Sequence, residues 1–196
     1  MSVIGPHSRE RGDMMKEKVV YSLDLTVKNN LQTGFKCRHE DVGCREVSKA
    51  VKAMLESLRR KAKAKGRNWD YCVYGVVSNV SVSRCCVSSY HVHLLFYGSP
   101  CCVIAKEAKE YWTSHGYGNS IQQSLKRCQD YGKVDYVLKH AKVAKDFGLP
   151  KQEFVQFVGD AGAGSKEEVF KLFEKVLPKA AVEYPYESWK ERFVSC

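Results

Sequence analysis

The feature that most constrains the fold is a short segment, residues 90–98, in which apolar and polar side chains alternate before an apolar end. Because side chains alternate along a strand, one face would carry four apolar residues, Tyr90, Val92, Leu94 and Phe96. His91 and His93 then stand side by side on the opposite face. Histidine is the commonest metal ligand, and two neighbouring imidazoles can share one ion. The segment therefore predicts a strand that presents a metal-binding histidine pair.

A second segment, residues 135–141, has a helical pattern and places Tyr136 and Lys139 one turn apart on the same face. A tyrosine phenol can act as a nucleophile, but its ordinary pKa is about 10, so the site must favour the phenolate or accept its proton during attack. Lys139 would stabilise the phenolate or the charge on a phosphate; the alternative is an ordinary exposed lysine. His140 and His115 belong to no motif, and we expect them to be structural or exposed.

The remaining periodicities predict an α+β fold. Strands are expected over residues 19–28, 71–83, 90–98 and 120–125, and helices over residues 45–64, 103–114 and 131–147. This order is that of a ferredoxin-like, split βαβ antiparallel sheet with an added helix, which carries Tyr136. Two helices would cover one face of the sheet. The other face, with the histidines, would stay open apart from a partial roof formed by the added helix.

The chain divides at Pro150 into a core and a C-terminal extension. Residues 1–17 are polar and predict a flexible leader, residues 18–149 the main domain, and residues 150–196 an extension packed on or appended to it. The extension should contain a strand over residues 153–158 and helices over residues 166–176 and 184–193. Its glycine-rich stretch lacks the Gly-Lys-Ser/Thr order of a phosphate loop, so Ser165 and Glu168 are interpreted as a helix capping box.

The charge of the chain indicates a polyanionic partner. A formal net charge of +10 and a pI of about 9.1 favour nucleic acid first and an acidic membrane surface second. The basic run over residues 59–67 is either a solvated helix end or a DNA contact. The sequence shows no apolar run long enough to span a bilayer and no apolar signal core, which predicts a soluble cytoplasmic protein with no membrane partner. Its nine cysteines are then expected to be reduced thiols.

The His91-Val92-His93 segment, followed by Tyr136 and Lys139, resembles the HUH endonucleases. The order of the two motifs is similar to that of rolling-circle replication initiators of small plasmids and viruses, archaeal ones in particular, and the resemblance covers about residues 19–147. It implies a site-specific single-stranded DNA endonuclease and strand transferase that forms a 5′-phosphotyrosine link and frees a 3′-hydroxyl. It further implies a divalent metal, Mn²⁺ or Mg²⁺, origin DNA as substrate, a host polymerase and helicase as partners, and a monomer or dimer.

The resemblance also implies a third metal ligand, usually a glutamate or similar polar residue on a neighbouring strand. This chain departs from that pattern, because no carboxylate lies between Asp70 and His91. Two replacements are consistent with strand alternation: Asp24 on the first strand and Asn79 on the hairpin partner. Asp24 is favoured because it offers a true carboxylate.

The number of tyrosines on the helix separates classes within this family. Tyr131 is five residues from Tyr136, so the two lie on different helix faces, and the sequence resembles the single-tyrosine enzymes. One alternative function is a single-tyrosine transposase of the same superfamily. The other is a non-enzymatic RRM-like module that binds single strands on an open sheet face, although histidines occupy positions where such a module needs stacking aromatics.

Overall fold

The structure is a computed structural model that describes residues 18–27, 43–81, 86–118, 123–159, 161–180, 186 and 190–191. It is an α+β fold with a five-stranded antiparallel sheet and four helices. In chain order the elements are β1 (Val19–Thr26), α1 (Cys44–Ala64), β2 (Asp70–Ser81), β3 (Cys86–Ser99), α2 (Cys101–Ser114), β4 (Ser124–Arg127), α3 (Gly132–Asp146), β5 (Lys151–Val158) and α4 (Lys166–Val176).

The strand order across the sheet is β4-β1-β3-β2-β5, and every neighbouring pair is antiparallel. This arrangement is compatible with a ferredoxin-like α+β fold. The histidine strand β3 lies in the centre, between β1 and β2. Its register pairs His93 with Asp24 on one side and with Val76 on the other, so these three side chains point to the same face.

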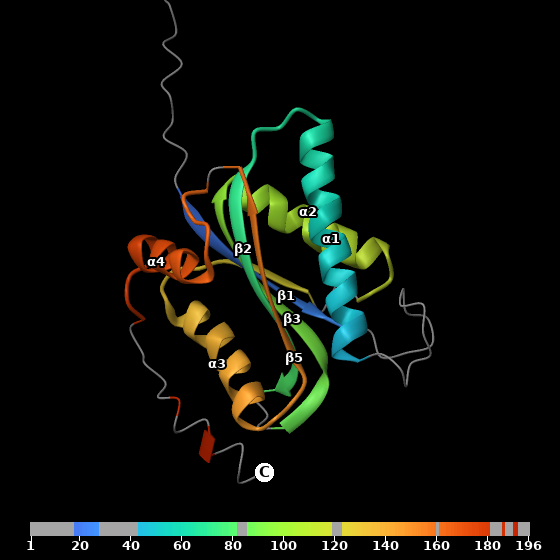
Figure 1. Ribbon diagram of the computed structural model, residues 1–196, viewed down its shortest axis with the longest axis vertical. Coiled ribbons are helices and arrows are strands. Elements are labelled where there is room, and N and C mark those ends of the chain that lie inside the picture. The colour runs from blue at the N-terminus through green and yellow to red at the C-terminus, as the bar shows by residue number, and fades with distance from the viewer. Residues whose placement is uncertain are drawn as a thin grey trace, which may run out of the picture.

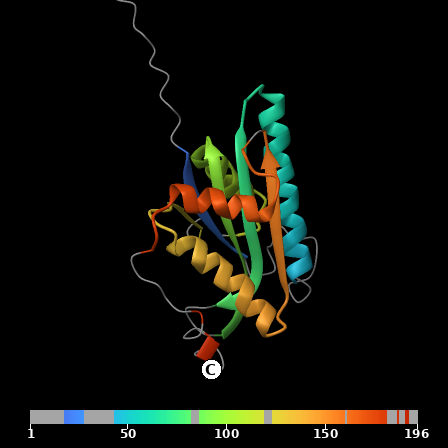
Figure 2. The ribbon, with the colours of Figure 1, turned by 60° about the vertical axis from the view of Figure 1, so that its left-hand side comes forward.

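Helices α1 and α2 cover one face of the sheet, as the two views of the ribbon show (Figures 1 and 2). Helix α1 turns an apolar stripe toward the sheet, as its periodicity predicts, and α2 contributes the fully buried Trp112. Apolar strand residues that pack against these helices include Leu23, Leu25, Val73, Val92, Leu94 and Phe96. The core on this face is continuous and apolar.

Helices α3 and α4 cover the other face, so the predicted open face does not exist in the described part of the chain (Figure 2). Strand β2 explains the error. Tyr71, Val73 and Val77 enter the first core, whereas the alternate residues Cys72, Tyr74 and Val76 enter the second. A strand that is buried on both faces has no polar face, so alternation gives no information about which side is covered.

The C-terminal part continues the same sheet and core. Strand β5 pairs with β2 along its whole length, and α4 inserts Val169 and Phe173 beside α3. The capping box at α4 is confirmed, because Ser165 Oγ accepts the Glu168 N–H while the Glu168 carboxylate accepts the Ser165 N–H.

The strand expected over residues 120–125 is observed at Ser124–Arg127, and residues 120–122 lie outside the described residues. The side chain of Gln123 accepts a hydrogen bond from the Thr26 N–H at 2.9 Å, so sheet pairing starts after it. The predicted leader, residues 1–17, and most of the predicted last helix, residues 184–193, lie outside the described residues. Among the described residues, no helix has the length and apolar character that crossing a membrane requires.

Candidate metal centre and tyrosine site

Three imidazoles meet on the α3 side of the sheet. His91 and His93 come from β3, as the alternation predicts, and His140 comes from α3. One nitrogen of each ring lies within 4.8 Å of the others. The ring centres are separated by 5.1 Å between His91 and His93 and by 4.3 Å between His93 and His140. Such a cluster could hold one cation.

Helix α3 brings the predicted nucleophile to the same place. Tyr136 and His140 are four residues apart and therefore lie on one helix face. The Tyr136 ring centre is 4.6 Å from that of His140 and 5.4 Å from that of His93. The structure thus joins the histidine pair and the tyrosine, which are about forty residues apart in the sequence.

Asp24 lies behind His93 and uses both of its carboxylate oxygens there. Oδ1 accepts a hydrogen bond from His93 Nδ1 at 2.7 Å, and Oδ2 accepts one from Lys133 Nζ at 2.9 Å. Because Nδ1 carries the proton in this bond, the lone pair of neutral His93 is on Nε2. A carboxylate in this position orients a metal-binding histidine. The geometry therefore favours an orienting role for Asp24 over the predicted role of third ligand.

His91 is oriented by a backbone irregularity in the neighbouring strand. The β2–β3 register shifts between Ser78 and Val80, and the Val80 carbonyl accepts a hydrogen bond from His91 Nε2 at 2.7 Å. Asn79, the second predicted ligand, lies half-buried within this irregularity. Val76 and Ser78 pair with His93 and His91, so the even-numbered residues of β2 face the histidines and the parity predicted for Asn79 from the sequence is wrong. The bulge also interrupts the alternation at this point.

The cluster contains buried polar atoms without partners. His93 is 4% exposed and His140 is 1% exposed. In the described part of the chain, His93 Nε2 and both ring nitrogens of His140 have no hydrogen-bond partner. Leaving such an atom unsatisfied costs about 1–3 kcal/mol. A cation bound by these nitrogens would satisfy them, so the donor set fits a metal ion.

Burial keeps these imidazoles in the neutral form that binds metal. It lowers the pKa of His140 strongly, helped by the neighbouring His93 and His91, while the Val80 carbonyl acts in the opposite direction. Burial also lowers the pKa of His93, against the opposing effect of Asp24. Both rings therefore present lone pairs at neutral pH.

The charges around Tyr136 are balanced by Asp24 and Lys133. Burial opposes ionisation of Asp24, but its bonds to His93 and Lys133 dominate and lower its pKa to about 2. Burial, followed by the charge of Asp24, raises the pKa of Tyr136, so the phenol is protonated at neutral pH. Lys133 Nζ lies 4.3 Å from the centre of the Tyr136 ring and offsets the Asp24 charge there.

Sequence reasoning missed two members of the site, His140 and Lys133. His140 was expected to be structural or exposed, and Lys139 was the predicted partner of Tyr136. Lys139 is half-buried one turn after Tyr136, whereas the lysine over the tyrosine ring is Lys133, one turn before it. Lys133 lies three residues before Tyr136 and His140 four residues after it. This spacing places all three on one helix face, and it was the signal in the sequence that could have identified both residues.

The ligand types bear on which metal fits. Imidazole nitrogens suit Mn²⁺ and the later transition metals, whereas Mg²⁺ requires mainly oxygen ligands. With three imidazoles and Asp24 engaged elsewhere, the site fits Mn²⁺ or a softer ion better than Mg²⁺.

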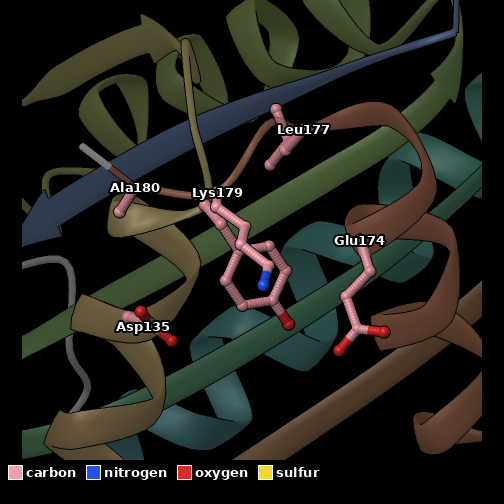
Figure 3. A pocket seen from close by; sticks show the side chains of 6 residues that line it. Asp135, Glu174, Leu177, Lys179 and Ala180 are labelled. Atoms are coloured by element: carbon pink, nitrogen blue, oxygen red, sulfur yellow. The ribbon is translucent and has the colours of Figure 1, made fainter. Parts of the chain in front are cut away.

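Tyr131 lies apart from the histidines, in a pocket of about 340 Å³ between α3 and the end of α4. Asp135, Glu174 and Lys179 surround this pocket (Figure 3). Burial, Glu174 and Asp135 together raise the pKa of Tyr131 to about 12. This tyrosine is thus poorly placed and poorly activated as a second nucleophile.

Comparisons with protein-family models, with curated proteins and with solved structures found no match to this chain. The geometry of the site is therefore the main guide to function.

Proposed function

We propose that the protein is a metal-assisted, single-tyrosine DNA nuclease and strand transferase of the HUH type that initiates rolling-circle replication. Its core would be a ferredoxin-like βαββαβ unit, with α3 as the added helix. One observation carries the proposal: the Tyr136 ring packs against His93 and His140, beside the His91–His93 pair. The role in replication rests on the resemblance of the motifs to initiators.

The chemistry is a transesterification. The Tyr136 phenol oxygen attacks phosphorus, the bond from phosphorus to the 3′-oxygen breaks, and the DNA 5′ end becomes linked to the tyrosine. The phenol gives up its proton during attack, and the departing 3′-oxygen gains one. A divalent cation held by His91, His93 and His140 would polarise a non-bridging phosphate oxygen. Lys133 holds Asp24 and faces the Tyr136 ring, so it limits the repulsion between Asp24 and the developing phenolate.

Access to the site would come from the side of His91 and Tyr136, which are partly exposed, as are Asp24 and Lys133. His93 and His140 lie deeper. A single strand can bring one phosphate to such partly covered side chains more easily than a duplex can, which is consistent with a single-stranded substrate.

The RRM-like alternative requires an open sheet face on which bases can stack. In the described residues both faces are covered by helices. A binding module of that type is therefore disfavoured.

The proposal is tested with a random-sequence pool of single-stranded oligonucleotides labelled at the 3′ end and incubated with Mn²⁺. The expected product is a labelled protein that survives denaturing electrophoresis, because the 3′ fragment stays attached to Tyr136. A 5′-labelled pool should instead give shortened, protein-free DNA.

Two matched variants locate the nucleophile. Tyr136→Phe should abolish the adduct, and Tyr131→Phe, on the same helix but in the separate pocket, should retain it. Absence of an adduct across the whole pool, or an adduct that survives Tyr136→Phe, would overturn the proposal.

A further inference from the structure

A basic hollow of about 420 Å³ lies between the start of α1 and the start of β5. Its charged lining residues are four cations, Arg45, Lys49, Lys52 and Lys151, and no carboxylate lines it. We call this the basic hollow. We infer that it binds the phosphate backbone of a polynucleotide.

Three of the four cations are available for a ligand. Within the described residues, Arg45, Lys49 and Lys52 are exposed and form no ion pair, whereas Lys151 bonds Glu153 at 2.6 Å. Their spacing of four and three residues puts them on one stripe of α1. That stripe spans about 10 Å, the length over which one strand of a duplex carries roughly three phosphates.

The other end of α1 behaves differently, although it carries more basic residues. Arg59 and Arg60 lie 2.8 and 3.8 Å from the Glu56 carboxylate. Arg67 pairs with Glu107 at 2.9 Å and also lies over the Trp69 ring. Glu56 and Glu107 offset only part of this charge, since Lys61, Lys63 and Lys65 are exposed and form no ion pair among the described residues. The start of α1 is the stronger candidate for nucleic-acid contact because its cations line one hollow that no carboxylate enters.

The backbone at the start of α1 adds to the positive potential. The helix begins after Gly43, which is extended and offers no side-chain cap. The first N–H groups of a helix lack intrahelical acceptors and point outward, with the positive end of the helix dipole behind them. Glu46 in this first turn offsets part of that potential, so the lysines and arginine supply most of the positive charge of the hollow.

The position of the basic hollow connects it to the tyrosine site. Lys151 pairs with Ser78, and Ser78 pairs with His91, so Lys151 is two strands from the histidine pair, or about 10 Å across the sheet, whereas the three cations on α1 lie over the opposite face. The starts of α1 and β5 lie at one end of the sheet (Figure 1). A strand bound in the hollow could pass around this end to the site at Tyr136.

A polynucleotide fits these features better than a membrane does. The charges line a concave surface. In the adjoining part of the α1–β5 seam Leu55 and Phe154 are buried, and Val155, 36% exposed, is the one exposed apolar side chain among its lining residues. A surface that binds a bilayer would instead project apolar side chains toward it. This inference deepens the proposed function, but its test needs neither metal nor cleavage.

The test is fluorescence anisotropy with a labelled random-sequence single-stranded oligonucleotide in EDTA, over a series of salt concentrations. The hollow variant combines Arg45→Gln, Lys49→Gln and Lys52→Gln. The matched control combines Lys61→Gln, Lys63→Gln and Lys65→Gln, which removes the same charge from exposed positions at the other end of α1. Circular dichroism and thermal melting confirm that both fold.

The hollow variant should weaken binding by at least about tenfold near 100 mM salt and reduce the slope of log K against log salt by about two. The control should change affinity less than about threefold. Equal losses in the two variants, or no loss in the hollow variant, would overturn the inference. The inference would also be overturned if the hollow variant lost binding to phosphatidylserine vesicles but kept its affinity for DNA.

The two proposals can fail separately. Intact binding through the basic hollow with no covalent adduct would contradict the nuclease proposal alone. An adduct at Tyr136 with no dependence on the three cations would contradict this inference alone.

Discussion

The two faces of the sheet use burial in opposite ways. Under α1 and α2 the buried side chains of β1, β2 and β3 are apolar apart from the Tyr71 hydroxyl, and Leu94 and Phe96 are fully buried. Under α3, by contrast, the neighbouring positions of the same strands bury His93 beside Asp24, with His140 above them. The first face contributes stability. The second gives up part of that stability to hold polar groups in a fixed arrangement, which is the pattern expected of a functional site.

The sharpest test of this contrast is Phe96→Ala, in the apolar face. Removing a fully buried phenylalanine should lower the free energy of unfolding by about 3–5 kcal/mol, measured by urea denaturation. Val155→Ala, at a position that is 36% exposed, serves as the control and should change it by less than about 1 kcal/mol. A small effect of Phe96→Ala would mean that the apolar face is not the main source of stability.

On the polar face, Asp24→Asn should weaken metal binding by about 10–100-fold, because it removes the carboxylate that orients His93. Calorimetric titration with Mn²⁺ measures the effect. Asp135→Asn makes the same charge change on α3 but toward the Tyr131 pocket, and it should leave the affinity for Mn²⁺ unchanged. Similar losses in both variants would show that Asp24 acts only through net charge.

The next test separates function from stability at His140. In EDTA, His140→Leu should raise the free energy of unfolding by about 1–2 kcal/mol, because it replaces two buried nitrogens without partners by an apolar side chain. The same variant should lose most of its affinity for Mn²⁺. His115→Leu, at an exposed position, should change neither property. A destabilised His140→Leu protein would contradict the idea that this face gives up stability.

The remaining test is the pH dependence of stability without metal. His93 and His140 have a lower pKa in the folded than in the unfolded protein, where the ordinary value is 6.5. The stability of the protein should therefore be constant with respect to these groups above about pH 6.5 and decline below it, as the unfolded chain takes up protons first. The decline is about 1.4 kcal/mol per pH unit for each histidine that stays neutral.

Urea denaturation between pH 7 and pH 5 in EDTA measures this slope, and His140→Leu should reduce it. Asp24 contributes in a lower range: its pKa of about 2 in the folded protein, against an ordinary 3.8, means that its contribution is lost only as the pH falls from about 4 to 2. An unchanged slope in His140→Leu would place the titrating groups elsewhere.

The sequence predicted those elements whose signals lie within one short segment of the chain. Helix α4 is observed over the predicted residues, Lys166–Val176, because its capping box and apolar stripe are both encoded within the helix. The shared face of His91 and His93 follows from strand alternation, and the pairing of Asp24 beside them follows from the strand order.

The predictions were wrong where the structure depends on which other element packs against a segment. Strand β2 has apolar residues on both faces, so the sequence does not indicate that α3 and α4 close the second face. The bulge next to Asn79 shifts the alternation of side chains along β2, and no proline or glycine beside it in the sequence indicates this bulge. His140 was missed because a single histidine in a helix is informative only once the facing strand is known.

Helix α3 carries Lys133, Tyr136 and His140 at intervals of three and four residues, all facing the part of the sheet where Asp24 and His93 pair. Each added residue turns an α-helix by about 100°. One alanine inserted between Tyr136 and His140 would therefore swing the phenol and the imidazole out of alignment, even though every side chain of the site would still be present. The proposed activity would therefore depend on the spacing within this helix as much as on the identity of its residues.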